Sequence, residues 1–362
     1  MKKISLLSAV LLWVVLSPAV APGLFGCSTF VLQKGERLLF GRNYDFFTGS
    51  GAVVVNPRGL AKTALVFPGE NAASWTAQYG SVTFNQVGRE FPMGGMNEAG
   101  LVVEIMWHFN AAYPAPDARP GAMELQWIQC LLDTCASVGE AVAAAEKVRI
   151  MPMGSQLHFH LLDRAGGEAI VEFIQGKAQI YRGRDLPVKA LTNQTYSECL
   201  AARKEFLSFG GAKPLHTTIS DPDRFMALAA ALRRPGSEGK LLERAWEILD
   251  EVHCDLKESP TQWRFVYDPR RLEIHIRTLK NPALRRIGFK DLSFDCASGA
   301  RVIDLDEGSG DLGKSFIAYT PAFNEALVRR TFAAYRQAGF QKDMPDFYLA
   351  VLAGYPNGLK CR

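Results

Sequence analysis

The chain has 362 residues, of which 48% are hydrophobic and 22% are charged, and this balance allows a sizeable buried core. The net charge is +4, and two lysines near the start are the only charged residues before Cys27, so residues 27–362 carry +2. A surface this close to neutral argues against a nucleic-acid partner.

The first 26 residues are typical of an export signal. Two lysines precede an apolar run, residues 4–16, that is shorter than the roughly 20 residues of a membrane-spanning helix. The small residues Ala19-Val20-Ala21 then supply a cleavage position. We therefore predict a signal peptide and short propeptide in residues 1–26 and a single domain in residues 27–362. The mature protein is expected to be secreted across the inner membrane into the periplasm, without a stable membrane anchor.

Seven cysteines are distributed along the chain. If Cys27 is reserved as the first residue of the mature protein, six remain that an oxidising compartment allows to pair. The sequence leaves the fifteen or so possible pairings open. A bond between Cys130 and Cys135 is not expected, because both lie in one predicted helical stretch. No CxxC motif occurs, which argues against a zinc site or a redox dithiol.

Strands dominate the first third of the chain after Cys27. The turn residues Lys34-Gly35-Glu36 predict a hairpin that carries Cys27 at its start and Arg42 and Asp45 near its end. Residues 94–100 are rich in glycine and are predicted to form a turn. The strands expected in this part of the chain are 27–32, 38–44, 52–56, 63–67, 81–87 and 101–107.

Helices and further strands alternate in blocks along the rest of the chain. Asn193 directly follows one predicted strand, and Arg224 lies in the first turn of a predicted helix. This block order favours an α+β fold with layered antiparallel sheets and helices outside, not a repeating parallel βαβ sheet. The helices expected are 124–134, 137–147, 196–206, 222–232, 241–254 and 322–337. The strands expected are 156–163, 168–173, 178–181, 189–192, 262–267, 272–277 and 302–304.

Cys27 gains a free α-amino group beside its thiol if cleavage makes it the first residue of the mature protein. Its thiol and its new α-amino group then have pKa values near 8.5 and 8, so one residue supplies both a nucleophile and its base. Such a site also needs a cation beside the thiolate, an anion for the amine and donors for the oxyanion. Arg42 and Asp45 suit the first two roles. Asn193 has a side-chain NH₂ group for the third, and Arg224 adds positive charge from a helix N-terminus.

Four segments together resemble the choloylglycine hydrolase and penicillin V acylase family, which belongs to the N-terminal nucleophile hydrolases. Cys27 followed by Arg42-Asn43-Tyr44-Asp45 resembles the family's nucleophile element. Gly95-Met96-Asn97-Glu98-Ala99-Gly100-Leu101 is similar to the family's segment before its next strand. Leu191-Thr192-Asn193 and Asp223-Arg224-Phe225 resemble the sites that supply an oxyanion asparagine and a second arginine.

The resemblance implies an αββα sandwich of two stacked antiparallel sheets and hydrolysis of linear, non-peptide amides. Cys27 is then the nucleophile, Asp45 binds its α-amine, and Arg42 holds the environment of the thiol. Asn193 fills the oxyanion hole and Arg224 supports its charge. At the family's remaining oxyanion position this chain has Trp107, so only a backbone NH carries over there, and Met106 and Trp107 are expected to shape an apolar acyl pocket.

The resemblance also bears on substrates and partners. It implies a small-molecule N-acyl amide substrate, such as penicillin V, a conjugated bile salt or an N-acyl homoserine lactone, and a possible homotetramer. We expect no cofactor and no metal, because His158 and His160 share one strand face without a third ligand in the sequence pattern.

Two other functions remain open at the level of the sequence. The residues Leu24-Phe25-Gly26-Cys27 also resemble a lipoprotein box, in which Cys27 is acylated and serves as an anchor. An acyltransferase that uses the same Cys27 nucleophile passes the acyl group to an amine instead of to water. Arg42 and Asp45 alone also fit an ordinary surface ion pair.

Overall fold

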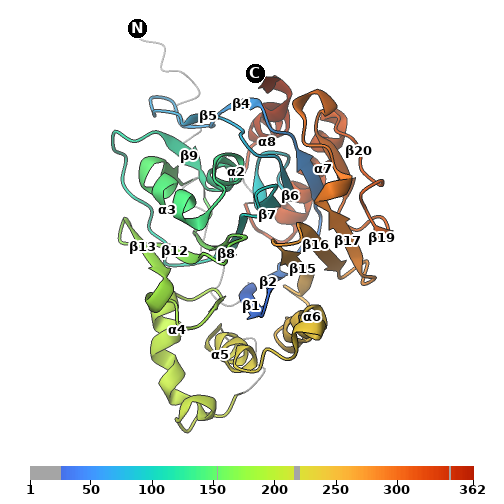
Figure 1. Cartoon of the computed structure of the whole chain (residues 1–362). Helices are drawn as coiled ribbons and strands as arrows, with labels where there is room; N and C mark the ends of the chain where they lie inside the picture. Colours follow the sequence, from blue (N-terminus) through green and yellow to red (C-terminus); the bar gives the residue numbers. More distant parts are fainter. Residues whose placement is uncertain (1–25, 153, 216–220, 342–343) are drawn as a thin grey trace.

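The computed structural model describes residues 26–362 other than 153, 216–220 and 342–343, so the predicted signal peptide lies outside the described residues except for Gly26. Two large, mainly antiparallel sheets face each other in the middle of the molecule (Figure 1). The first, sheet A, has the strand order β14 (Ala190–Leu191), β1 (Ser28–Lys34), β2 (Arg37–Asp45), β15 (Thr261–Asp268), β16 (Glu273–Thr278), β17 (Arg285–Gly288) and β19 (Gly310–Asp311).

The second, sheet B, takes its strands from both early and late parts of the chain. Its order is β13 (Lys177–Arg182), β12 (Glu168–Ile174), β11 (Leu157–Leu162), β8 (Val102–Trp107), β7 (Pro92–Asn97), β6 (Ser81–Asn85), β3 (Ala52–Asn56), β18 (Arg301–Asp304) and β20 (Ile317–Ala318). Two small sheets flank these large ones. They pair β9 (Gly121–Met123) with β10 (Arg149–Met151), and β4 (Leu60–Thr63) with β5 (Ser74–Thr76) and β21 (Lys360–Cys361).

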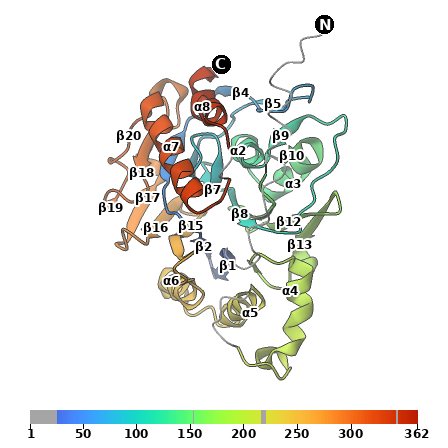
Figure 2. The same cartoon turned by 180° about the vertical axis from the view of Figure 1, so that it is seen from behind.

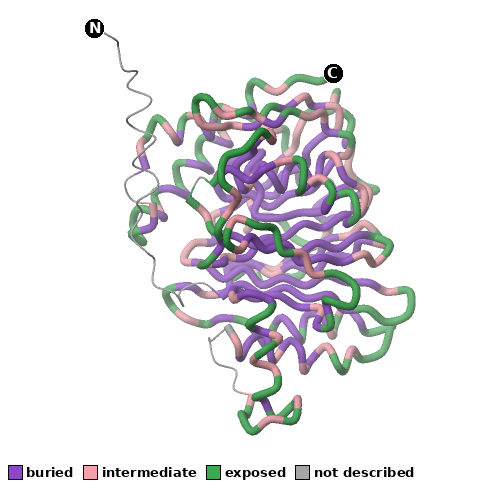
Figure 3. Tube along the Cα trace, turned by 90° about the vertical axis from the view of Figure 1, so that its left-hand side faces the viewer, coloured by how far each residue is buried: buried purple, intermediate pink, exposed green. Residues whose placement is uncertain are grey.

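Side chains from the inner faces of the two sheets form the core between them. The rings of Phe84 on β6 and Phe265 on β15 stack with centroids 3.9 Å apart. Phe40 on β2 packs against His160 on β11, with centroids 4.8 Å apart. Nearly continuous burial along these strands follows, because both sheets are covered on both faces. Figure 3 shows this buried region as a band through the middle of the molecule.

Helices cover the outer faces of the sheets (Figures 1 and 2). α2 (Glu124–Thr134) packs on β7 and β8, with α3 (Val138–Lys147) beside it. On the opposite side, α5 (Asp221–Leu232) and α6 (Leu241–Glu251) pack on β1 and its neighbours. The layers are therefore α, β, β and α, and the predicted α+β sandwich of two stacked antiparallel sheets with helices outside is confirmed. The remaining helices are α4 (Tyr196–Ala202), α7 (Pro321–Gln337) and α8 (Asp346–Gly354).

The C-terminal segment is fastened to the rest of the molecule. α7 and α8 pack against each other, and Asn324 on α7 donates a hydrogen bond to the carbonyl of Ala353 on α8. A disulfide joins Cys296 to Cys361, next to the pairing of β21 with β4. The thiols of Cys130, Cys135 and Cys254 are reduced, so among the described residues only part of the possible cysteine pairing forms.

Most predicted elements form within a few residues of their expected bounds, with two clear exceptions. Residues 94–97 are not part of a turn but continue strand β7, and the turn is confined to the residues that follow. A Cβ at Gly94 would clash with the Glu104 carboxylate, and one at Gly95 would lie 2.5 Å from the carbonyl of Val82, so these glycines allow close strand packing. The strand predicted over 63–67 is also wrong, because β4 ends at Thr63.

Smaller differences concern helix ends and one unpredicted helix. The predicted helix 196–206 ends at Ala202 and continues as a short 3-10 helix, Arg203–Glu205. α8 was not predicted at all. None of the helices in the described part of the chain combines the length and apolar character that crossing a bilayer requires.

Candidate active site

The order of strands in sheet A brings the predicted catalytic residues together. Cys27 immediately precedes β1, which is flanked by β14 on one side and β2 on the other. Thr29 pairs with Leu191 and Ser28 pairs with Asn43. Because antiparallel register runs in opposite directions along the two strands, the end of β14 carries Asn193 toward Cys27, and the end of β2 carries Asp45 toward it.

The Cys27 side chain is buried and directed inward. Its Sγ lies 3.9 Å from the backbone carbonyl oxygen of Asp45, to which the thiol donates a weak hydrogen bond. Burial raises the pKa of the Cys27 thiol to about 11, while the guanidinium groups of Arg42 and Arg224 act in the opposite direction. The nitrogen of Cys27 is part of the peptide bond to Gly26 in this form of the chain, so it carries no free amine.

Asp45 is held by groups from two distant parts of the chain. Thr261 on β15 donates a hydrogen bond of 2.5 Å to its Oδ1, and Nη1 of Arg224 lies 3.6 Å from its Oδ2. Within the described residues, Oδ2 accepts no hydrogen bond. Burial raises the pKa of the Asp45 carboxyl to about 7, against the lowering effects of Arg224 and Thr261.

Arg224 and Asn193 form a connected pair beside the nucleophile. Arg224 lies in the first turn of α5, and its guanidinium donates hydrogen bonds to the carbonyl oxygen of Gly26 at 2.5 Å and to Oδ1 of Asn193 at 3.2 Å. The side-chain amide nitrogen of Asn193, Nδ2, donates in turn a hydrogen bond of 2.8 Å to the backbone carbonyl oxygen of Trp107. The chain of contacts therefore runs from the Gly26–Cys27 peptide to the end of β8.

Arg42 has a partner that the sequence reasoning missed. Its guanidinium forms a buried ion pair with Glu104 on β8 and donates a hydrogen bond of 3.2 Å to the carbonyl of Met93. Glu104 also accepts a hydrogen bond from the hydroxyl of Tyr267. Both charged side chains are 1% exposed, so Arg42 is not half of a surface ion pair but a fixed cation between the two sheets.

An apolar pocket opens beside the cluster, with a cavity volume of about 100 Å³. Cys27, Arg42 and Asp45 line it, and so do the predicted pocket residues Met106 and Trp107. Its apolar wall comes from several elements, including α7, α8 and the segment between them. These wall residues include Phe46, Phe91, Met93, Ile105, Met123, Leu157, Phe332, Tyr335, Phe340, Met344, Tyr348 and Leu352.

All five predicted polar residues, Cys27, Arg42, Asp45, Asn193 and Arg224, therefore belong to one connected cluster. The sequence could have indicated a buried, paired role for Glu104, because it is the one charged residue inside the apolar run 101–107. Thr261 had none, since a threonine that begins a strand is unremarkable. The pocket residues of α7 and α8 were also missed, because helical periodicity does not reveal which cavity a helix lines.

Residues 308–315, Gly-Ser-Gly-Asp-Leu-Gly-Lys-Ser, match the pattern GxxxxGK[ST] of phosphate-binding loops. That motif requires a strand before the loop and a helix after it. Here β19 lies inside the segment, and β20 follows it where the helix would begin. We therefore assign no phosphate site to these residues.

The family model for acyl-coenzyme A:6-aminopenicillanic acid acyl-transferase matches residues 31–276, which is more than half of the chain. The chain belongs to this family. A penicillin V acylase from Pectobacterium atrosepticum is 27% identical over 280 residues, which cover 66% of this chain and 74% of that protein. The solved penicillin V acylase from Agrobacterium tumefaciens is 28% identical and has a TM-score of 0.72, over 82% of this chain and 98% of that one.

The conjugated bile acid hydrolase from Clostridium perfringens shares the fold, with a TM-score of 0.65 and 17% identity over 79% of this chain and 98% of that one. The resemblance to the choloylglycine hydrolase and penicillin V acylase family is thus confirmed. These relatives are amidohydrolases, and the family to which the chain belongs is a family of enzymes.

Proposed function

We propose that this protein hydrolyses small N-acyl amides through Cys27, after the residues up to Gly26 have been removed. The observation that carries this proposal is the cluster itself. A buried thiol, a carboxylate and two arginines meet beside an apolar pocket, with Asn193 joined to the same network. These are the groups that an N-terminal thiol needs for attack on a carbonyl.

Maturation is the first step of the proposal. Arg224 donates to the carbonyl of Gly26, which is the carbonyl of the bond to be cut, and thereby polarises it. The α-amine does not yet exist, so Asp45, with its pKa raised to about 7, is the base at hand for the thiol proton. The Cys27 thiolate attacks this carbonyl, and the C–N bond breaks as Asp45 returns the proton to the departing nitrogen of Cys27. That nitrogen becomes the α-amine, and Gly26 is left as a thioester on Sγ. Water hydrolyses the thioester, which frees the thiol and the residues ending at Gly26.

The mature enzyme then uses the amine as its base. The amine takes the proton from the Cys27 thiol, and the thiolate attacks the substrate carbonyl. Asn193 and Arg224 stabilise the negative charge on the carbonyl oxygen. The C–N bond breaks, the leaving amine takes the proton, and water releases the acid from the thioester. The Oδ2 atom of Asp45 lies 3.0 Å from the position of a Cβ on Gly26, so it is placed to orient the new ammonium.

The pocket supports a compact apolar acyl group. Its volume of about 100 Å³ is small beside the roughly 300–1,000 Å³ of sites for drug-sized ligands. A flat aryl or short aliphatic chain fits such a space better than a steroid. The relatives named penicillin V acylase support the same choice, and we propose phenoxyacetyl amides such as penicillin V as the preferred class over bile salts.

Acyl transfer is the second candidate, because the matching family model is named for an acyl-transferase. Transfer and hydrolysis share the thioester and differ only in the nucleophile that attacks it. A membrane anchor on Cys27 is less well supported, because a lipid on this buried thiol has to occupy the pocket.

Export to the periplasm is part of the proposal. The Cys296–Cys361 disulfide supports an oxidising compartment. Assembly into a homotetramer also remains a prediction.

The decisive experiment compares the intact mass and activity of the purified wild type and Cys27→Ala. We expect the wild type to begin at Cys27 and to release 6-aminopenicillanic acid from penicillin V. The Cys27→Ala variant is expected to retain Gly26 and to show no turnover. Active protein with a different first residue would overturn the proposal.

Adding free amines to the same assay separates the two candidates. Hydrolysis predicts that the released acid equals the released amine over a wide range of acceptor concentration. Acyl transfer predicts that a new amide replaces the acid as the acceptor is raised.

A further inference from the structure

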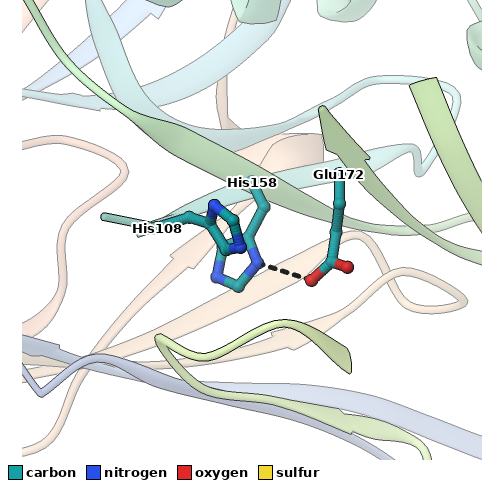
Figure 4. A group of neighbouring side chains, drawn as sticks. All are labelled: His108, His158 and Glu172. Atoms are coloured by element: carbon teal, nitrogen blue, oxygen red, sulfur yellow. Dashed lines mark hydrogen bonds and ion pairs between the residues drawn. The ribbon is translucent and has the colours of Figure 1, made fainter. Parts of the chain in front are cut away.

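Three buried side chains form a second polar cluster that lies outside the residues lining the pocket. His108 follows the end of β8, His158 lies on β11 and Glu172 lies on β12, and these three strands are neighbours in sheet B. One ligand atom from each residue lies within 4.8 Å of the others. Figure 4 shows the two imidazole rings against each other and the Glu172 carboxylate directed at His158; the ring centroids are 4.9 Å apart.

The cluster has more hydrogen-bonding capacity than its neighbours use. Nδ1 of His158 and Oε1 of Glu172 share a hydrogen bond of 2.9 Å. Nδ1 of His108, Nε2 of His158 and Oε2 of Glu172 are buried and have no hydrogen-bond partner among the described residues. All three side chains belong to residues that are at most 1% exposed, where an unsatisfied polar atom is costly.

His160 provides an internal comparison. It lies two residues further along β11, on the same face, and is equally buried. Its Nδ1 is hydrogen-bonded to the hydroxyl of Thr29 at 2.9 Å and its Nε2 to Glu168 at 3.0 Å. Both ring nitrogens of His160 are therefore used inside the protein. The unused nitrogens of His108 and His158 are not a general property of buried histidines in this fold.

We propose that His108, His158 and Glu172 bind one divalent transition-metal ion of the zinc type. Two imidazole nitrogens and one carboxylate oxygen suit Zn²⁺, Co²⁺ or Ni²⁺ better than Mg²⁺ or Ca²⁺, which prefer oxygen ligands. Tetrahedral coordination with bonds of about 2.0 Å sets ligand atoms about 3.3 Å apart, so small side-chain rotations suffice to close the cluster on an ion.

The contacts of these ligands point to a structural role beside the oxyanion residue. Trp107, whose carbonyl accepts the hydrogen bond from Asn193, immediately precedes His108. Oε1 of Glu172 accepts a hydrogen bond from the backbone NH of Tyr196, three residues after Asn193. The ion would brace both segments that hold Asn193 while remaining outside the reacting atoms. It therefore acts on the position of Asn193 and takes no step in bond breaking.

The test uses full-length protein without an affinity tag, freed of metal by chelation and titrated with Zn²⁺. We expect one equivalent to bind saturably, the unfolding temperature to rise with Zn²⁺ concentration, and Co²⁺ to give the visible absorption of a tetrahedral site. The Cys27→Ala chain should behave identically, which separates this proposal from the proposed reaction. Absence of saturable binding by the wild type, which requires no variant to fold, would overturn the proposal.

Two variants locate the site, and one serves as a matched control. His108→Asn and Glu172→Gln should each weaken Zn²⁺ binding by more than the roughly 10- to 100-fold typical of lost outer-shell partners. His160→Asn removes an equally buried histidine from the same strand face and should leave the Zn²⁺ affinity unchanged. Equal weakening by His160→Asn, or undiminished binding by His108→Asn and Glu172→Gln, would place the ion elsewhere and refute the assignment.

Discussion

The polar cluster around Cys27 and the cover of the pocket are built in opposite ways. The cluster consists of buried polar groups that neutralise and orient one another, such as Arg42 with Glu104 and Asp45 with Arg224. The cover, formed by α7, α8 and the segment between them, presents mainly aromatic and aliphatic side chains to the same pocket. The groups of the cluster therefore depend on specific polar partners, whereas the cover acts mainly through the shape that it gives to the pocket.

The two regions also differ in their relation to the family. Arg42, Asp45, Asn193 and Arg224 lie within the residues that match the family model and Cys27 lies just before the first of them, whereas α7 and α8 lie beyond the last matched residue. We infer that the reaction is tied to the family and that the choice of acyl group is tied to this C-terminal cover. Substitutions in the cluster should then change the rate, and substitutions in the cover should change which substrate is preferred.

The largest effect is expected for Glu104→Gln. The substitution leaves the buried Arg42 charge without its partner, and breaking such a pair typically costs about 3–5 kcal/mol of stability. Arg42 also loses an anchor beside Cys27, so kcat/KM should fall. Urea unfolding and steady-state kinetics measure the two effects. Unchanged stability and rate would show that Glu104 does not hold Arg42.

Two further variants sharpen this result. Glu325→Gln breaks the exposed ion pair of Glu325 with Arg329 on α7 and should change stability by no more than about 0.5 kcal/mol. The double variant Arg42→Met with Glu104→Leu replaces the buried charges by apolar side chains, which can restore stability. It should not restore turnover, because the cation beside Cys27 is gone. Recovery of activity would contradict the role given to Arg42.

The same contrast explains what the sequence could and could not reveal. Asn193 and Arg224 were predicted because each lies near a recognisable boundary, a strand end or a helix start, within a segment that resembles the family's motifs. The contact between Asn193 and Arg224 was not, because it depends on how α5 packs on sheet A. Layered antiparallel sheets with helices outside were predictable from the blocks of strands and helices, and the family resemblance implied the αββα order. The strand order within each sheet requires long-range pairing.

Some errors trace to local signals that tertiary packing overrides. Gly94 and Gly95 suggested a turn, yet both lie in strand β7. Glycine is required at these two positions because neighbouring groups leave no room for a side chain. The expectation that His158 and His160 bind no metal is not one of these errors and stays a prediction, but it rested only on spacing along the chain. Their other partners come from β1, β12 and the end of β8, which no spacing along the chain can supply.

An intermediate effect is expected for the pH dependence of maturation. Since the pKa of Asp45 is raised to about 7 in the precursor, the carboxylate needed to accept the thiol proton disappears below that pH. The rate of Gly26–Cys27 cleavage should therefore fall about tenfold for each pH unit below 7. Mass spectrometry of refolded precursor over time measures this rate. A rate that is flat from pH 5 to 8 would exclude Asp45 as the base.

Stability provides an independent check with a defined sign. The folded precursor keeps a proton on Asp45 that the unfolded chain releases near pH 4, so unfolding free energy should decrease as pH rises from about 4 to about 7. The uncleavable Cys27→Ala precursor allows this measurement. Adding Asp45→Asn should remove the decrease. Adding Asp346→Asn should not, since Asp346 is an exposed carboxyl whose pKa is lowered by Arg336.

The smallest effect, and the sharpest test of the division between cluster and cover, is expected for Phe340→Leu. The Phe340 ring lies 5.8 Å from Trp107 and 5.9 Å from Phe46, centroid to centroid, and lines the pocket. A contact of this ring with the phenoxy group of the substrate would be worth about 0.5–1.5 kcal/mol, so its loss should raise KM for penicillin V by up to roughly tenfold. Since no catalytic group moves, kcat should stay within about twofold, and aliphatic acyl amides should gain relative to phenoxyacetyl amides.

Phe347→Leu is the matched control, because Phe347 lies on α8 with half of its surface exposed and is not among the pocket residues. It should leave both constants unchanged. A fall in kcat with KM unchanged for Phe340→Leu would mean that the cover also positions the reacting groups. In that case the contacts of Phe340 with Trp107 would act on Asn193, which is hydrogen-bonded to the Trp107 carbonyl. The residues that set the rate and those that choose the acyl group would then not belong to separate regions of the chain.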